Sequence, residues 1–105
     1  MRRATILRRL KGMGLTNFQI DVLMAAYSIP RGETISYKAL AELAGHPNAY
    51  RAVGSVMRKN PMAPIIPCHR VIRSDGRLGS YSGGGTDVKR RMLISERAIS
   101  EKRRA

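Results

Sequence analysis

The chain has 105 residues, which is enough for one small domain and too few for two. Its formal net charge of +13 favours a polyanionic partner. Nucleic acid is the first expectation, ahead of an anionic membrane surface or a ribosome, although a protein from a generally basic proteome could carry the same charge. The single cysteine excludes an internal disulfide, and together with two histidines at no recognised ligand spacing it predicts no metal site.

Residues 1–15 are expected to form a basic arm, in which the stretch "ATILRRL" can be helical. The arm has no apolar run long enough for a signal peptide or a membrane span, so we expect an intracellular protein in a reducing compartment. A helix follows, because Thr16 and Gln19 have capping-box spacing and apolar residues recur after them at helical intervals. Pro30 and Gly32 end this helix.

A second helix is predicted over "YKALAELAG", after a short extended link that includes "ETIS". Ser36 is a suitable N-cap for this helix, and Gly45 is a natural stop at its C-terminal end. Helical spacing predicts that Ala39, Leu40 and Leu43 form its buried stripe.

A third helix is predicted over "AYRAVGSVMRKN", with Asn48 as its N-cap. Ala49, Val53 and Val56 share one face of it, and the opposite face carries Arg51, Gly54, Ser55 and Arg58. Glycine inside a helix costs about 1 kcal/mol relative to alanine. Close approach to a DNA groove would offset that cost, and tight packing against another helix is the alternative. The order helix, short turn, helix predicts a helix-turn-helix with this third helix in the recognition position.

The last third of the chain predicts a β-hairpin and a final helix. Residues 65–66 and 71–72 are β-like, and "SDG" at residues 74–76 is a strong turn signal, so together they predict a wing. Thr86 is the expected cap of the helix "DVKRRMLISE". The expected fold is mainly α with a short β-hairpin, a winged helix-turn-helix-like domain. The expected division is an arm at 1–15, the functional domain at 16–96 and a basic tail at 97–105.

Cys68 has three readings: an inert core thiol, a redox sensor or a nucleophile. Pro67 favours a turn that brings His69 toward the sulfur, and the positive charge of Arg70 favours the thiolate. Glu96 projects onto the inner side of the last helix, where a carboxylate needs a partner, although an exposed Glu96 at a frayed helix end fits the spacing equally well. A relay from Glu96 through His69 to Cys68 would activate a nucleophile.

The stretches "ISYKALAELAG", "YRAVGSVMRKNP", "PCHRVIRSDGRLGSYSGG" and "LISE" occur in that order between about Phe18 and Glu96. They closely resemble the DNA-binding, active-site domain of the O6-alkylguanine-DNA alkyltransferases, and the PCHRV box is highly specific in this context. The resemblance implies binding to duplex DNA through the minor groove, rotation of an O6-alkylated guanine out of the stack, and irreversible transfer of the alkyl group to Cys68. Each molecule would act once, as a methylated-DNA–protein-cysteine methyltransferase without a cofactor.

The resemblance also implies roles for individual residues. His69 would be the base acting through a water, Glu96 would orient His69, and Asn60 would brace the active-site turn. Arg51 would fill the gap left by the base, and the rest of the DNA-binding helix face would comprise Ala52, Gly54, Ser55 and Arg58. The base pocket would comprise Tyr37, Val71 through its carbonyl, Tyr81, Ser82 as a donor to O6, and Gly83.

The matched region corresponds to the catalytic domain only. We expect the family's usual N-terminal domain, which carries a zinc site in some members, to be missing from this sequence apart from the basic arm. Tyr50 stands where several relatives have a small residue, and "GGGTDVK" is one residue longer than the usual glycine loop. The expected partner is double-stranded DNA carrying O6-alkylguanine, bound by a monomer in the cytoplasm at the nucleoid, with no membrane and with room for a fused or separate repair partner. Lesion binding without transfer and architectural DNA binding are the alternatives.

Overall fold

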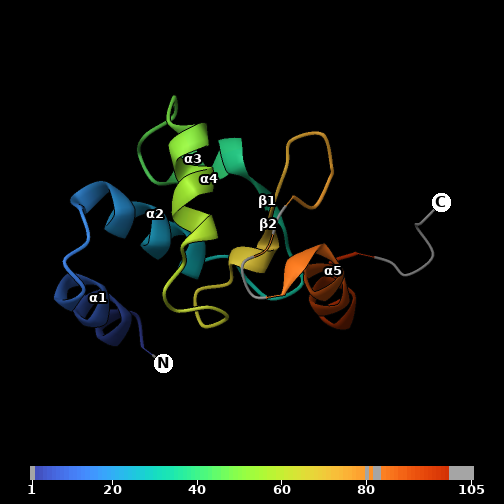
Figure 1. Cartoon of the computed structure of the whole chain (residues 1–105), viewed down its shortest axis with the longest axis horizontal. Helices are drawn as coiled ribbons and strands as arrows, with labels where there is room; N and C mark the ends of the chain where they lie inside the picture. The colour runs from blue at the N-terminus through green and yellow to red at the C-terminus, as the bar shows by residue number, and fades with distance from the viewer. Residues whose placement is uncertain (1, 80, 82–83, 100–105) are drawn as a thin grey trace.

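The computed structural model describes residues 2–79, 81 and 84–99. Helices surround one short pair of strands, with α1 at one end of the molecule and α5 toward the other (Figure 1). In chain order the elements are α1 (Arg3–Gly12), α2 (Asn17–Tyr27), β1 (Ile35–Ser36), α3 (Tyr37–Leu43), α4 (Tyr50–Arg58), the 3₁₀ turn η1 (Cys68–Arg70), β2 (Val71–Ile72) and α5 (Gly85–Ser95).

The N-terminal segment is a helix packed on the domain. Ile6 and Leu10 of α1 are fully buried, and α1 packs against α2. The capping box that begins α2 is confirmed: the Gln19 amide donates to the Thr16 hydroxyl at 3.1 Å, and the Thr16 amide donates to the Gln19 side-chain oxygen at 2.8 Å. These bonds satisfy amide groups that have no partner inside the helix.

Helices α3 and α4 form the expected helix-turn-helix, although two details differ. Ser36 caps α3 by accepting a hydrogen bond from the Ala39 amide at 3.0 Å, as predicted. Leu43 is 57% exposed, so the predicted stripe is wrong there, and Ala41 is buried beside Leu40 instead. Asn48 is not the cap of α4, because the helix begins at Tyr50 and the N-cap position is Ala49, which has no side-chain hydrogen bond to the helix.

The predicted β-hairpin is wrong in its pairing. Val71–Ile72 pairs in parallel with Ile35–Ser36, more than thirty residues earlier, and residues 65–66 form no strand. The turn at "SDG" is present, since the Arg73 amide donates to the Arg77 carbonyl at 2.8 Å and Gly76 has φ +88°. The rest of the fold class, a mainly helical helix-turn-helix domain, is confirmed. The strand pair joins the helix-turn-helix to the turn that carries Cys68.

Helix α5 packs against η1 and begins without a side-chain cap. Thr86 is therefore not the cap, and its hydroxyl instead donates to the Gly79 carbonyl at 3.3 Å. Leu93 is buried and Val88 and Met92 are half-buried, so these three residues form the inner side of α5.

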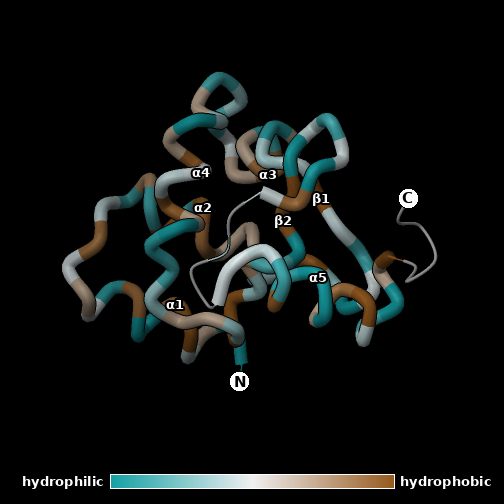
Figure 2. Tube along the Cα trace, turned by 45° about the vertical axis from the view of Figure 1, so that its right-hand side comes forward, coloured by the Kyte–Doolittle hydropathy of each residue, from teal (hydrophilic) through white to brown (hydrophobic). Residues whose placement is uncertain are grey.

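The hydrophobic core lies between α1, α2, the helix-turn-helix and β2. In Figure 2 hydrophobic stretches of α2 and β2 lie inside, whereas the outer turns are largely hydrophilic. Within the described part of the chain, no helix combines the length and apolar character needed to cross a bilayer.

Candidate active site

Cys68 lies at the start of a tight turn. The Cys68 amide donates to the Ile66 carbonyl at 2.8 Å, and the Arg70 amide donates to the Pro67 carbonyl at 2.9 Å. This turn is the one expected from Pro67, and it places Cys68 and His69 together inside the domain, at 4% and 2% exposure.

His69 and Arg70 both bind one carboxylate, that of Glu96 at the end of α5. His69 Nε2 lies 2.9 Å from Glu96 Oε2, and the Arg70 guanidinium donates to both Glu96 oxygens, at 2.8 and 2.9 Å. Arg70 also donates to the Ile29 carbonyl at 2.7 Å, which ties the group to the end of α2. The Glu96 side chain is 6% exposed, so it is not at a frayed helix end.

This carboxylate determines the tautomer of His69. Hydrogen bonds from Arg70, with further ones from His69, lower the pKa of Glu96 from 4.5 to about 2 against the opposing effect of burial. An ionised carboxylate only accepts hydrogen bonds, so Nε2 carries the proton and a neutral His69 keeps a lone pair on Nδ1. Nδ1 is buried and has no hydrogen-bond partner within the described residues. The ring can therefore accept a proton at Nδ1.

Asn60 supports the chain segment that leads to Cys68. Its amide group donates to the Ile66 carbonyl at 2.7 Å, and its oxygen accepts from the Met62 amide at 3.0 Å. Asn60 is only 9% exposed, and the two bonds close the loop between α4 and η1 from inside. Its side chain thus holds the backbone immediately before the turn.

Two tyrosines lie around the thiol. Tyr81 is buried, and its ring meets the His69 ring edge to face with centroids 6.3 Å apart. Burial, followed by the charge of Cys68, raises the pKa of Tyr81 and also that of Tyr37. Both hydroxyl groups therefore remain protonated donors at neutral pH.

Lys89 is a site residue that the sequence reasoning missed. It is fully buried, and its ammonium group donates to the Val71 carbonyl at 2.6 Å and also to the Leu78 carbonyl. Burial lowers its pKa from 10.5 to about 8, while the charge of Cys68 acts in the opposite direction. Lys89 lies four residues before Leu93, so its position on the inner face of α5 was visible in the sequence.

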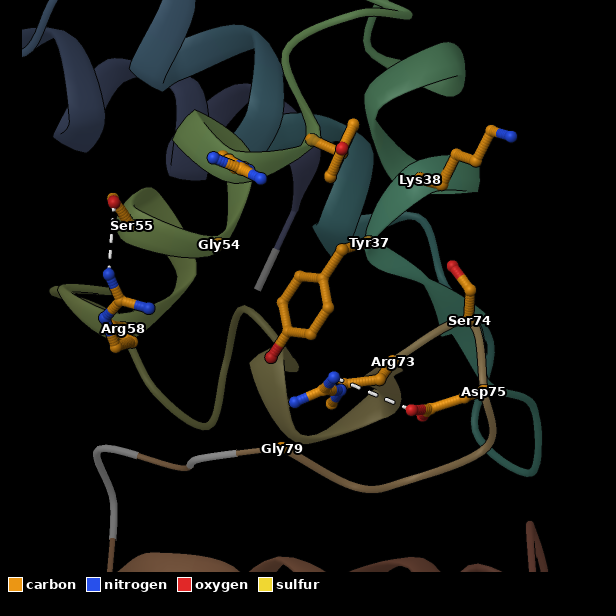
Figure 3. Close-up of a pocket in the computed structure, with 11 residues that line it drawn as sticks. Tyr37, Lys38, Gly54, Ser55, Arg58, Arg73, Ser74, Asp75 and Gly79 are labelled. Atoms are coloured by element: carbon orange, nitrogen blue, oxygen red, sulfur yellow. Dashed lines mark hydrogen bonds and ion pairs between the residues drawn. The ribbon is translucent and has the colours of Figure 1, made fainter.

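The outer face of α4 lines a pocket of about 630 Å³. Arg51, Gly54, Ser55 and Arg58 line it from α4, as the helix angles predicted. Figure 3 shows Tyr37 reaching across the pocket from α3 and Arg73 on the opposite wall, paired with Asp75 at 3.6 Å. Four basic side chains line this pocket against one acidic side chain, so it suits an anionic ligand: Lys38, Arg51, Arg58 and Arg73 against Asp75.

Among the described residues, no atom packs against the position where Gly54 would carry a side chain. A Cβ atom built on Gly54 would meet nothing within 4 Å in the described structure. Packing against another helix therefore does not explain a residue that costs about 1 kcal/mol in a helix interior. Close approach of an external ligand to the helix backbone remains as the explanation.

The other predicted site residues lie partly outside the pocket and partly outside the described residues. Ala52 is exposed on α4 but does not line the pocket. Val71 is buried in β2, and its carbonyl already accepts from Lys89. Ser82 and Gly83 lie outside the described residues. Among the residues that are described, no three His, Cys, Asp or Glu side chains gather in a way that could hold a metal ion.

Residues 17–98 match the family model of the 6-O-methylguanine DNA methyltransferase DNA-binding domain. The chain thus belongs to the 6-O-methylguanine DNA methyltransferase family. A mouse relative, methylated-DNA–protein-cysteine methyltransferase, is 62% identical over 65 residues, which are 62% of this chain and 31% of the relative.

Two solved structures show the same fold. The Mycobacterium tuberculosis OGT in complex with DNA superposes with a TM-score of 0.76 at 46% identity, over 80% of this chain and 52% of that one. The S. pombe Atl1, in complex with damaged DNA containing O6-carboxymethylguanine, superposes with a TM-score of 0.68 at 28% identity. The match covers 78% of this chain and 77% of the Atl1 chain. The chain thus spans about a third of the mouse relative and about half of the mycobacterial protein.

Proposed function

We propose that this protein repairs DNA by moving the alkyl group of an O6-alkylguanine in duplex DNA irreversibly onto Cys68. The unit that does this is the domain of residues 16–96. The observation that carries the proposal is the buried His69–Glu96 pair beside Cys68, because the carboxylate leaves the Nδ1 lone pair of His69 free to take a proton. Nucleophilic catalysis needs a base held in one tautomer by a third group.

In the proposed reaction, His69 Nδ1 takes the thiol proton through a bridging water. The sulfur then attacks the alkyl carbon from the side opposite O6, so that the S–C bond forms as the C–O6 bond breaks. The electron pair of that bond passes to the guanine, which takes up one proton. The products are guanine and an S-alkylcysteine, and no step restores the thiol, so each molecule reacts once.

The pocket along α4 is the proposed DNA-binding surface. Its basic side chains supply affinity for phosphates without sequence preference. The open backbone at Gly54 and the small side chains of Ala52 and Ser55 let α4 approach a minor groove closely. Arg51 enters the base stack and Arg58 contacts the backbone.

The flipped base is proposed to lie between Tyr37 and the segments at Val71 and Tyr81. Base flipping costs a few kcal/mol, and less for a weakly paired lesion. Tyr37 contacts the base, and the Val71 carbonyl accepts from the guanine amino group. Ser82 donates to O6 beside Gly83. The proposed substrate is chromosomal DNA, so the protein is expected at the nucleoid.

The test is the intact mass of the protein after incubation with a duplex that contains O6-methylguanine. The expected result is a gain of one methylene group that maps to Cys68, with no gain in Cys68→Ala. Cys68→Ala should still bind the lesion more tightly than undamaged duplex. Tight binding of the lesion by the wild-type protein without a mass gain would contradict the transfer.

That contradicting result would favour a second candidate, lesion recognition without transfer. The likeness to Atl1, solved with DNA containing O6-carboxymethylguanine, supports this candidate. The buried base beside a thiol at Cys68 favours transfer, because recognition alone needs neither group.

A further inference from the structure

A second basic pocket lies on the other side of the loop that lines the first. It has a volume of about 450 Å³ and lies between residues 73–79 and α5. The two pockets share Arg73 and Gly79, so the loop forms a wall common to both. In Figure 1 this loop rises from β2, with α4 to its left and α5 below it. A ligand seated along α4 therefore ends beside the second pocket.

Among the described residues, the second pocket is lined by three guanidinium groups, from Arg73, Arg77 and Arg90, and by no acidic side chain. Asp75, on the same loop, is shared by Arg73 at 3.6 Å and Arg77 at 3.8 Å, so it neutralises at most one of them. Arg90 forms no hydrogen bond or ion pair with another described residue. Among the described lining residues, two positive charges thus remain in excess in one concave surface.

The Arg73 and Arg77 side chains can leave Asp75 and turn toward a ligand at little cost in free energy. The Arg73 and Arg77 side chains are 55% and 77% exposed, and ion pairs of that kind contribute about 0–1 kcal/mol. Arginine presents a planar set of donors that matches the oxygens of a phosphate, and it keeps its charge at all relevant pH values. The ligand class that this pocket fits is a phosphodiester.

We propose that the second pocket binds a backbone phosphate of the same duplex that α4 engages, beyond the edge of the first pocket, with Arg90 as its central contact. The proposal rests on the proposed binding of duplex DNA. Continuity through the shared wall assigns the phosphate to the bound duplex, and free inorganic phosphate is the other source to be separated by experiment. The site extends the DNA contact from the helix-turn-helix to α5.

The first experiment measures how duplex affinity depends on salt for wild type, Arg90→Gln and the control Arg91→Gln. Arg91 is the exposed neighbour on α5 and lines neither pocket. Each lost phosphate contact lowers the slope of log K against log salt by about 0.9. Arg90→Gln should lose about that much and Arg91→Gln should not. Equal slopes in all three proteins would overturn the proposal.

The second experiment locates the phosphate. Duplexes carrying one neutral methylphosphonate at successive positions are compared in both proteins. At one flanking position, the methylphosphonate should weaken binding by the wild-type protein about tenfold, which corresponds to roughly 1.4 kcal/mol of binding free energy. The same methylphosphonate should leave binding by Arg90→Gln unchanged. Sensitivity that is equal in both proteins at every position would overturn the assignment to the duplex. Competition by inorganic phosphate at constant ionic strength that removes the Arg90 effect would assign the pocket to free phosphate and likewise overturn it.

The test of the second pocket can fail or succeed independently of the test of alkyl transfer. A wild-type protein that shows no mass gain but keeps the Arg90-dependent slope refutes transfer and supports the second pocket. A mass gain on Cys68 with equal slopes supports transfer and refutes the second pocket. A wild-type protein with no measurable affinity for duplex DNA would refute both.

Discussion

Replacing Glu96 by Gln should remove a pH-dependent part of the stability of this domain. The pKa of Glu96 is about 2 against an ordinary 4.5. At about 1.36 kcal/mol per pH unit this difference corresponds to about 3 kcal/mol. That is an upper figure, because Arg31, which lies 3.9 Å from the Glu96 carboxylate, is 68% exposed and its contribution is screened by solvent. A carboxyl group whose pKa is lowered in the folded state stabilises that state above pH 4.5. The contribution is lost as the pH falls from 4.5 to 2.

The assay is urea unfolding of wild type and Glu96→Gln at a series of pH values from 7 to 2. The variant should be about 3 kcal/mol less stable at pH 7, where it leaves Arg70 without its carboxylate, and the gap should close toward pH 2. Glu33→Gln is a matched control, because Glu33 is exposed and forms no ion pair among the described residues. A gap between wild type and Glu96→Gln that stays constant from pH 7 to 2 would refute the reasoning.

The proposed alkyl transfer provides a second readout of the same substitution. A glutamine side chain can donate as well as accept, so it no longer keeps the proton of His69 on Nε2. The rate of transfer to Cys68 should fall by about 10²–10⁴, the range that a correctly positioned general base contributes. A variant with the expected loss of stability and an unchanged rate would show that Glu96 has a structural role only.

Three further substitutions test the site. Lys89→Met removes a lysine whose pKa is about 8 in the folded protein. In urea unfolding, the stability of the wild-type protein relative to this variant should therefore rise by up to about 3 kcal/mol between pH 8 and 10.5. A difference in unfolding free energy that stays constant over this pH range would contradict the prediction. Asn60→Ala breaks two buried hydrogen bonds and should lower the unfolding free energy by about 2–3 kcal/mol at pH 7, whereas a change below about 0.5 kcal/mol would mean that the loop before Cys68 holds itself. Arg51→Ala should slow transfer from duplex DNA by tenfold or more while leaving transfer from the free base O6-methylguanine nearly unchanged, since flipping costs a few kcal/mol; equal losses on the two substrates would refute its role in flipping.

The local structure of the first half of the chain was largely predictable. The capping box at Thr16 and Gln19 and the cap at Ser36 depend on groups three residues apart, so their spacing in the sequence was sufficient. The angles on α4 likewise predicted that Arg51, Gly54 and Arg58 share an outer face. What the helix angles left open was whether Gly54 packs against another helix. Only the open space around it in the folded chain excludes that explanation.

The errors came from contacts between distant parts of the chain. Residues 71–72 have the composition of a hairpin strand, but their partner is the segment at 35–36. A pairing across that distance leaves no local signal, because it depends on how α3 and α4 bring the two segments together. Leu43 was expected inside from its spacing, yet α3 ends at that residue, so no further turn covers its side chain.

The sequence by itself determined the family, through a series of motifs in a fixed order, and it determined the helices and the turn at Cys68, because those depend on neighbours a few residues apart. It also singled out Cys68, His69 and Glu96 as chemically related. The tertiary structure alone decided that Arg70 shares the carboxylate of Glu96, that Lys89 reaches two backbone carbonyls inside the domain, and that three arginines surround a second pocket. The physical reason is that burial and charge partners depend on packing between distant segments, and packing sets the pKa of a group and the direction in which a side chain can reach.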